Sequence, residues 1–182
     1  MGCRGVLFAL TPEQEARLLR EAHPKLGLIA KLAGKRFDQR EIDRNVLHFL
    51  TEEIEERWDE DWLCETDKAW DAIHRCLSNG SLSYEFSSPI QGAILGGAPL
   101  YAGGDYVVSY KTAAEVNQVA SAIAVISDDD MAARYDALDE EQYGCPKDEG
   151  DRQYTVEWFS AVRDFYQKTA LAGRPAVFTA DQ

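Results

Sequence analysis

The chain has 182 residues, of which 45% are hydrophobic and 10% aromatic, so it is long and apolar enough to bury a core as one domain. This composition excludes a globally disordered protein, and the longest apolar runs, such as AIAVI at 122–126, are far too short to cross a bilayer. A formal net charge of −13 disfavours binding to nucleic-acid phosphates, so neither nucleic acid nor a membrane is expected as a partner.

The cysteines and the start of the chain predict a reducing compartment. None of the four cysteines, Cys3, Cys64, Cys76 and Cys145, forms a C-x-x-C pair, so zinc-ribbon and thioredoxin interpretations have no support. The opening MGCRGV has Val6 where myristoylation requires serine or threonine, and no long apolar signal segment follows. The start of a strand is therefore favoured over a lipid anchor, and free thiols in the cytoplasm are expected.

The first 58 residues are predicted to hold a strand and two helices. The run GVLFAL at 5–10 is apolar enough for a buried strand. A helix then opens with Thr11 as N-cap and Gln14 completing a capping box, and it ends near residues 23–24. Residues 46–58, VLHFLTEEIEERW, are predicted as a helix with its acids outward.

The middle of the chain is predicted as two helices separated by loops and a strand. Residues 66–78 have helical periodicity and stop at an Asn-Gly pair. A strand is expected at about 105–110, within AGGDYVVSY. The next helix begins with Thr112 as N-cap, and Glu115 completes its capping box.

The last third is predicted to contain two more helices and a closing strand. Asp128 is expected to cap a helix, whose inner residues are Met131, Tyr135 and Leu138. Residues 143–153 are expected to form a loop before a long amphipathic helix that Gly173 ends, and AVFTA forms the last strand. Helices dominate without a βαβ rhythm, so we expect an α+β fold: one helix-rich domain over residues 1–182 with a small, mostly antiparallel sheet.

Two segments carry most of the negative charge. Residues 51–67 hold nine acids against Arg57, and residues 128–151 hold ten against Arg134 and Lys147. The ordinary interpretation is a well-solvated surface. The more specific hypothesis is a surface for a basic partner protein, because complementary charge steers association.

The segment CETDKAWDAIHRCL, residues 64–77, has the densest set of chemically capable side chains. In a helix, Asp67, Asp71 and His74 would share one stripe, while a second stripe would face the core: Trp70, Ile73 and Leu77. The polar stripe is a candidate metal site, a candidate general base oriented by a carboxylate, or part of a small-molecule or partner site. In the ordinary interpretation, His74 is a boundary histidine satisfied by its neighbours. No H-x-x-x-H pair is present, so no metal is expected, and no cofactor motif is found.

The same segment resembles a known family. TDKAWDAIHRCLSNG is similar to the D-K-x-W-x-x-x-H-x-x-L-x-G signature of the YfbM-like bacterial proteins, a family of unknown function, with the glycine one residue later. MGCRGVLFALTPEQ, PIQGAILGG and VEWFSAVRDFYQKTALAGRPAVFTA resemble other family segments, so the resemblance covers nearly the whole chain. The residues that match are Asp67, Lys68, Trp70, His74 and Leu77, with Tyr135 and Asp136 from ARYDA. Many family members carry a Tyr-Pro pair after this segment. In this chain, Gly-Cys separates Tyr143 from Pro146.

The resemblance implies a compact bacterial α+β domain and no particular activity. We therefore expect a binding or interaction protein whose acidic surface takes a basic partner, for example a toxin in an immunity-type pairing. The alternative is a small-molecule enzyme with His74 as base, Asp71 or Asp67 as its orienting group and Tyr135 as a donor. In a third interpretation the signature is a structural clasp.

Overall fold

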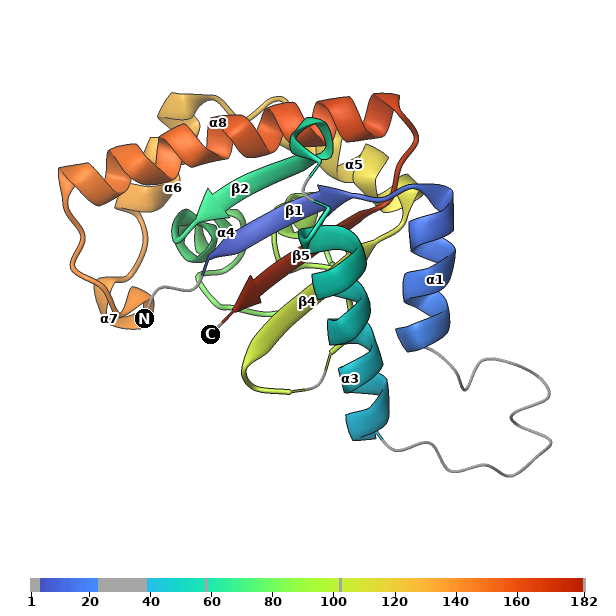
Figure 1. The fold of residues 1–182 in the computed structure, drawn as a ribbon. Helices are drawn as coiled ribbons and strands as arrows, with labels where there is room; N and C mark the ends of the chain where they lie inside the picture. Colours follow the sequence, from blue (N-terminus) through green and yellow to red (C-terminus); the bar gives the residue numbers. More distant parts are fainter. Residues whose placement is uncertain (1–3, 23–38, 58, 102, 182) are drawn as a thin grey trace.

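The computed structural model describes residues 4–22, 39–57, 59–101 and 103–181. Within them, helices pack on both faces of a five-stranded antiparallel sheet (Figure 1), which confirms the α+β class. Among these described residues, no helix combines the length and the apolar character that crossing a membrane requires.

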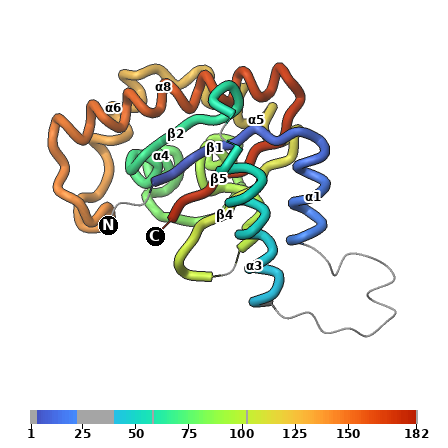
Figure 2. The backbone as a smooth tube through the Cα atoms, in the orientation of Figure 1, coloured from blue at the N-terminus to red at the C-terminus, as the bar shows by residue number. Residues whose placement is uncertain are grey.

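The strands come from both ends and the middle of the chain. They are β1 (Gly5–Ala9), β2 (Leu63–Asp67), β3 (Ala98–Pro99), β4 (Tyr106–Lys111) and β5 (Ala176–Asp181). Their order is β2-β1-β5-β4-β3, so the closing strand lies between the first strand and β4. Figure 2 shows the blue first strand beside the red last strand. The strands expected at 5–10, 105–110 and 176–180 are confirmed.

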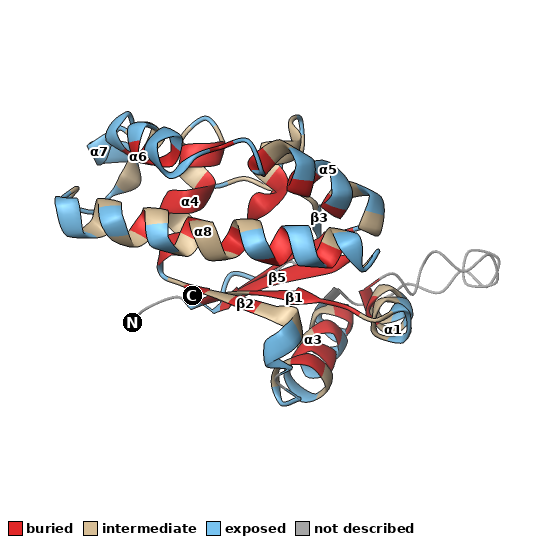
Figure 3. Cartoon of the chain, turned by 90° about the horizontal axis from the view of Figure 1, so that it is seen from above, coloured by how far each residue is buried: buried red, intermediate tan, exposed pale blue. Residues whose placement is uncertain are grey.

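One face of the sheet carries the C-terminal helices, together with the helix of the signature segment (Figure 3). They are α4 (Ala69–Leu77), α5 (Ala113–Ile123), α6 (Asp128–Asp136), α7 (Glu140–Tyr143) and α8 (Glu149–Leu171). The α5 capping box is confirmed: Thr112 Oγ1 accepts from the Glu115 N–H at 3.3 Å, and the Glu115 carboxylate accepts from the Thr112 N–H at 2.7 Å.

The opposite face is covered by α1 (Pro12–Ala22) and α3 (Gln39–Phe49), which continues as a π-helix, η2 (Leu50–Glu55). The expected Thr11 and Gln14 capping box is present, with distances of 2.8 and 3.2 Å. The predicted end of this helix at residues 23–24 lies outside the described residues. The prediction of one helix over residues 46–58 is wrong. Residues 46–49 are the end of α3, and residues 50–55 form the π-helix η2.

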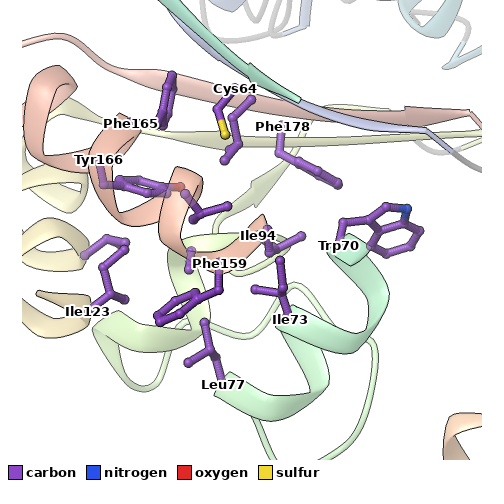
Figure 4. Close-up of a cluster of buried hydrophobic side chains, with 14 of the residues drawn as sticks. Cys64, Trp70, Ile73, Leu77, Ile94, Ile123, Phe159, Phe165, Tyr166 and Phe178 are labelled. Atoms are coloured by element: carbon purple, nitrogen blue, oxygen red, sulfur yellow. The ribbon is translucent and has the colours of Figure 1, made fainter. Parts of the chain in front are cut away.

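The core is divided by the sheet into two clusters. The larger cluster lies under α4, α5 and α8, and Figure 4 shows the side chains of Trp70, Ile73 and Leu77 entering it from α4. The inward stripe of the signature segment is therefore confirmed: these three residues are 4%, 0% and 1% exposed. The Trp70 and Phe178 rings lie 5.7 Å apart between centroids. The smaller cluster lies between the sheet and α1 with α3.

Three predicted boundaries are wrong. The helix expected from residue 66 begins at Ala69, because residues 63–67 pair with β1 as strand β2. Ser127, rather than Asp128, caps α6: its hydroxyl accepts from the Asp130 N–H at 3.0 Å. The predicted 143–153 loop ends early, because Asp148 caps α8 and its carboxylate accepts from the Asp151 N–H at 2.8 Å.

Candidate functional site

Asp67, Lys68 and Asp71 lie at or just after the junction of β2 and α4. Asp67 is the last residue of β2, with φ at 41°, and its carboxylate accepts a hydrogen bond from the Tyr154 hydroxyl at 2.7 Å. Lys68 directly precedes α4 and is exposed. Asp71 accepts from Arg75 Nε at 2.5 Å, one turn along the helix. The predicted helical stripe of Asp67, Asp71 and His74 therefore does not form, since Asp67 belongs to a strand.

His74 is buried, with 1% of its surface exposed. The Ser83 N–H lies 3.5 Å from its Nε2, and the Leu95 N–H lies 3.4 Å from its Nδ1. A neutral imidazole has one acceptor nitrogen, so only one of these backbone groups is fully bonded at a time. Burial and the charge of Lys111 lower the pKa of His74 to about 4, so the ring is neutral at pH 7. Because the ring is buried against the backbone of residues 83 and 95, neither of its nitrogens is exposed to solvent.

The backbone at residues 94 and 95, which His74 contacts, is also held by a buried lysine, Lys111. Nothing in the sequence indicates that this lysine would be buried. Lys111 is 0% exposed, and its Nζ donates to the Ile94 carbonyl and to Ser109 Oγ. The Ser109 hydroxyl donates in turn to the Leu95 carbonyl at 2.6 Å. Burial lowers the pKa of Lys111 to about 7. Lys111 and Ser109 thus bond the carbonyls of residues 94 and 95, and His74 faces the Leu95 N–H, so these side chains have a structural role.

Tyr135 and Asp136 take part in a separate network. The Tyr135 hydroxyl donates to Asp151 at 2.6 Å, and the Tyr143 hydroxyl donates to the same carboxylate oxygen at 2.9 Å. Burial and Asp151 raise the pKa of both tyrosines, so they stay protonated at neutral pH. Asp136 is exposed and pairs with Arg152 at 3.0 Å. The Tyr135 hydroxyl is thus engaged with Asp151 rather than with His74.

The acids of residues 128–151 lie on α6, α7 and the start of α8, elements that Figure 1 places on the same side of the molecule. We call the exposed acids of this segment the acidic surface: Asp128, Asp129, Asp130, Asp136, Asp139, Glu140, Glu141, Asp148 and Glu149. Most of them occupy N-caps or first turns, where the helix dipole favours negative charge. Local helix stability therefore accounts for their positions, and their exposure leaves the charge available to a partner.

The basic residues near this surface offset little of its charge. Arg163 pairs with Asp128 at 2.6 Å, and Arg152 lies 3.0 Å from Asp136. Lys147 is turned inward, because its Nζ donates to the carbonyls of residues 136 and 138 at 2.9 and 2.7 Å. The acidic segment 51–67 is different, since its Glu53 pairs with two arginines and its Glu65 with Arg4.

A pocket of about 270 Å³ lies on the sheet face that α1 and α3 cover only in part. These helices lie near the end of the sheet where β1 stops and β5 starts (Figure 1), and the pocket lies at the other end. We call it the sheet-end pocket, and its lining is Arg4, Val6, Phe8, Glu55, Tyr106, Thr179 and Asp181. Strand alternation places the strand residues of this lining on one face: Val6 is opposite Thr179, and Tyr106 is opposite Asp181.

The polar groups of the pocket are already ordered by one another. The Tyr106 hydroxyl donates to Glu55, and Thr179 Oγ1 lies 3.4 Å from the same carboxylate oxygen. Burial and the Glu55 carboxylate raise the pKa of Tyr106, which keeps its proton at neutral pH. Asp181 Oδ1 accepts from the Arg4 N–H at 2.9 Å. Glu55 is therefore held by hydroxyls of β4 and β5, and Asp181 is held by the N–H of Arg4, which directly precedes β1.

Glu55 reaches the pocket from the end of the π-helix. The Thr51 hydroxyl donates to the Leu47 carbonyl at 2.9 Å, and the Glu56 N–H bonds to the Thr51 carbonyl five residues earlier at 2.9 Å. Such widened turns are rare and are frequent at functional sites. No local sequence signal could reveal this pocket, because its lining comes from three strands and a helix end that are far apart in the chain.

Comparisons with known proteins agree with the predicted resemblance. A family model described as "Domain of unknown function (DUF1877)" matches residues 1–179. A solved structure, the crystal structure of a protein of unknown function YfbM from Escherichia coli, is similar with a TM-score of 0.57. The two are 14% identical, and the likeness covers 97% of this chain and 99% of that chain, so it shows a shared fold. No curated protein matches the sequence.

Proposed function

The chain belongs to the DUF1877 family of proteins of unknown function, and we propose that this member is a binding protein whose acidic surface takes a basic protein partner. The observation that carries the proposal is the exposure of nine acids on α6, α7 and the start of α8, eight of them at N-caps or in first turns. An immunity-type pairing, in which the acidic protein sequesters a basic toxin, is one such role.

Electrostatics supports this proposal in two ways. Six acids of the surface have no ion pair within the described ranges: Asp129, Asp130, Asp139, Glu140, Glu141 and Asp148. Their charges lie on short helices and caps that are already ordered, so a basic partner would meet a preformed surface. Such a surface raises association rates at low ionic strength and loses its effect when salt shortens the Debye length.

The test is capture of a partner from the lysate of the native host, at about 50 mM and about 500 mM salt, using three proteins. The first is the wild type, and the second neutralises the acidic surface with Asp129→Asn, Glu140→Gln and Glu141→Gln. The third is a matched control, Glu13→Gln, Glu56→Gln and Glu60→Gln, which neutralises as many exposed acids elsewhere. None of the substituted side chains caps a helix.

The expected result is a basic protein that the wild type and the control capture at low salt and release at high salt. The variant with the neutralised surface should capture much less of it. Equal capture by the two variants would contradict a role for this surface, and so would a partner whose retention does not depend on salt.

The enzyme hypothesis built on Asp67, Asp71 and His74 receives less support. Each of these side chains is engaged within the protein, with Tyr154, Arg75 and the backbone of residues 83 and 95 respectively. A general base must reach the proton that it removes, and His74 has almost no exposed surface. These residues are better explained as a clasp between β2, α4 and the following turn.

A further inference from the structure

The sheet-end pocket has a chemical character that the acidic surface does not share. Its floor is apolar, formed by Val6 and the nearly buried Phe8, and carboxylates stand at its sides. Binding sites for small molecules typically combine an apolar lining with a few fixed polar groups. In this pocket, the fixed groups are the carboxylates of Glu55 and Asp181 and the hydroxyls of Tyr106 and Thr179.

The pocket carries a net negative charge, because it has two carboxylates and its cationic side chain pairs with acids outside it. Arg4 also lines it, but its guanidinium is 2.5 Å from Glu65 and 4.0 Å from Asp67, both outside the lining. Asp181 Oδ1 accepts a neutral backbone N–H, and Glu55 Oε1 accepts two hydroxyls. The second oxygen of each carboxylate has no hydrogen-bond donor or cation among the residues that the structure describes.

The size of the pocket limits what it can hold. Its volume of about 270 Å³ is slightly below the range of roughly 300–1,000 Å³ that is typical for drug-sized ligands. A small molecule or a single side chain fits this space. An alkyl chain would lie on Val6 and Phe8, and a positively charged head would reach the carboxylates.

We propose that the sheet-end pocket binds a small organic cation, an alkylammonium or alkylguanidinium group, between the carboxylates of Glu55 and Asp181. The apolar stem contacts Val6 and Phe8, and the head donates to the two unpartnered carboxylate oxygens. A guanidinium can donate to both carboxylates at once, because its donors are arranged in a planar fork. An anion of the same size is repelled by the two carboxylates.

Tyr106 and Thr179 hold Glu55 ready for this ligand. Both hydroxyls bond to one carboxylate oxygen and leave the other without a donor among the described residues. Since these donors come from β4 and β5, the geometry of Glu55 depends on the sheet and not on the ligand. Tyr106 and Thr179 are therefore positioning residues in this proposal.

The test is an NMR titration of the isotope-labelled full chain with n-butylguanidinium, n-butylammonium and n-butyrate. The two cations should shift the signals of Val6, Thr179 and Asp181 in a saturable manner, and n-butyrate should not. The substitutions Glu55→Gln and Asp181→Asn each remove one charge while keeping the shape of the side chain, and each should weaken binding at least about tenfold. Glu60→Gln is the matched control, because Glu60 is exposed outside the lining.

Two further arms identify the source of the cation and the independence of the site. A tripeptide with a central arginine and blocked ends should bind more tightly than n-butylguanidinium if a partner's side chain is the natural ligand, and more weakly if a free amine is. The variant with the neutralised acidic surface should bind the cations as the wild type does, so this proposal and the proposed function can fail separately. Binding of n-butyrate as tight as that of the cations would overturn the inference, and so would unchanged binding in both Glu55→Gln and Asp181→Asn.

Discussion

The Tyr154 hydroxyl donates to Asp67 Oδ2 at 2.7 Å, which ties the first half of α8 to the turn between β2 and α4. Asp67 is also the only residue other than glycine, among those that the structure describes, with a positive φ. Aspartate and asparagine adopt this conformation more readily than most side chains. The residue that opens the family signature therefore combines a turn conformation with a contact between two distant elements.

The first prediction separates these two tasks of Asp67. Asp67→Asn keeps the turn preference and weakens the hydrogen bond, so it should lower the free energy of unfolding by less than about 1 kcal/mol. Asp67→Ala loses both the turn preference and the hydrogen bond, so it should lower the free energy of unfolding by about 1–2 kcal/mol. Tyr154→Phe removes only the hydroxyl. Urea unfolding of the single and double variants should give a coupling energy near 1 kcal/mol between Asp67 and Tyr154. A coupling energy of zero would mean that this bond adds nothing to stability.

The second prediction concerns His74 as a structural clasp. His74→Gln should lower the free energy of unfolding at pH 7 by about 1–3 kcal/mol, because it disturbs the packing and leaves buried N–H groups poorly bonded. The pKa of His74 is lowered to about 4 in the folded protein, so the unfolded chain takes up the proton first as the pH falls. The histidine's contribution is therefore complete above pH 6.5 and is lost by about pH 4.

Urea unfolding at several pH values checks this clasp. The stability difference between wild type and His74→Gln should shrink steadily from pH 7 to pH 4. Asp71→Asn is a useful control, because it alters the same helix at a half-buried position without touching the buried ring. A difference that stays constant with pH would contradict the neutral buried histidine.

Those parts of the fold that depend on local signals could be predicted from the sequence. The capping boxes at Thr11 and Thr112 each involve residues three apart, and both helices begin where predicted. Strand β2 cannot be predicted in this way, because its residues follow a run of acids that is typical of an exposed helix, and only Cys64 and Thr66 are buried in it. Its pairing with β1 joins positions about sixty residues apart, which periodicity does not detect.

The candidate sites show the same limit. The signature identified the family and the buried stripe of α4, because both follow from the spacing within one segment. The burial of Lys111 could not be predicted, because in the sequence this lysine only precedes a helix cap. Its burial is explained by its contact with the backbone at residues 94–95. The sheet-end pocket likewise depends on strand order, since Val6 and Thr179 become neighbours only when β5 inserts beside β1.

The third prediction uses two glycines that differ in their surroundings. A Cβ at Gly92 would lie 2.2 Å from Phe86 Cε2 and 2.6 Å from Val119 Cγ2, whereas a Cβ at Gly104 would meet nothing within 4 Å. Gly92→Ala should therefore lower the free energy of unfolding by about 1–3 kcal/mol through overpacking. Gly104→Ala should change it little, and thermal unfolding of both variants measures the contrast. Equal melting temperatures would show that Phe86 moves aside without cost.

The buried lysine gives the last prediction its physical basis. Desolvation lowers the pKa of Lys111 to about 7, well below its usual value of 10.5, although Glu115 acts in the opposite direction. Between these two values, the unfolded chain binds more protons than the folded protein, so the free energy of unfolding rises with pH. Buried Cys64 and Cys76 act in the opposite sense above pH 9, because their pKa is raised to about 12. The window from pH 7 to pH 9 is therefore the informative one.

Lys111→Met should remove this pH dependence, because methionine fills a similar volume and carries no proton. Between pH 7 and pH 9, the free energy of unfolding of the wild type should gain about 2 kcal/mol relative to that of the variant. At pH 7 the variant should be about as stable as the wild type, since the relief of a buried charge offsets the lost bond to the Ile94 carbonyl. Exposed Lys68, substituted in the same way, is the matched control and should leave the pH profile unchanged. Urea unfolding across the window measures all three proteins, and parallel profiles for wild type and Lys111→Met would show that Lys111 keeps its charge in the folded protein.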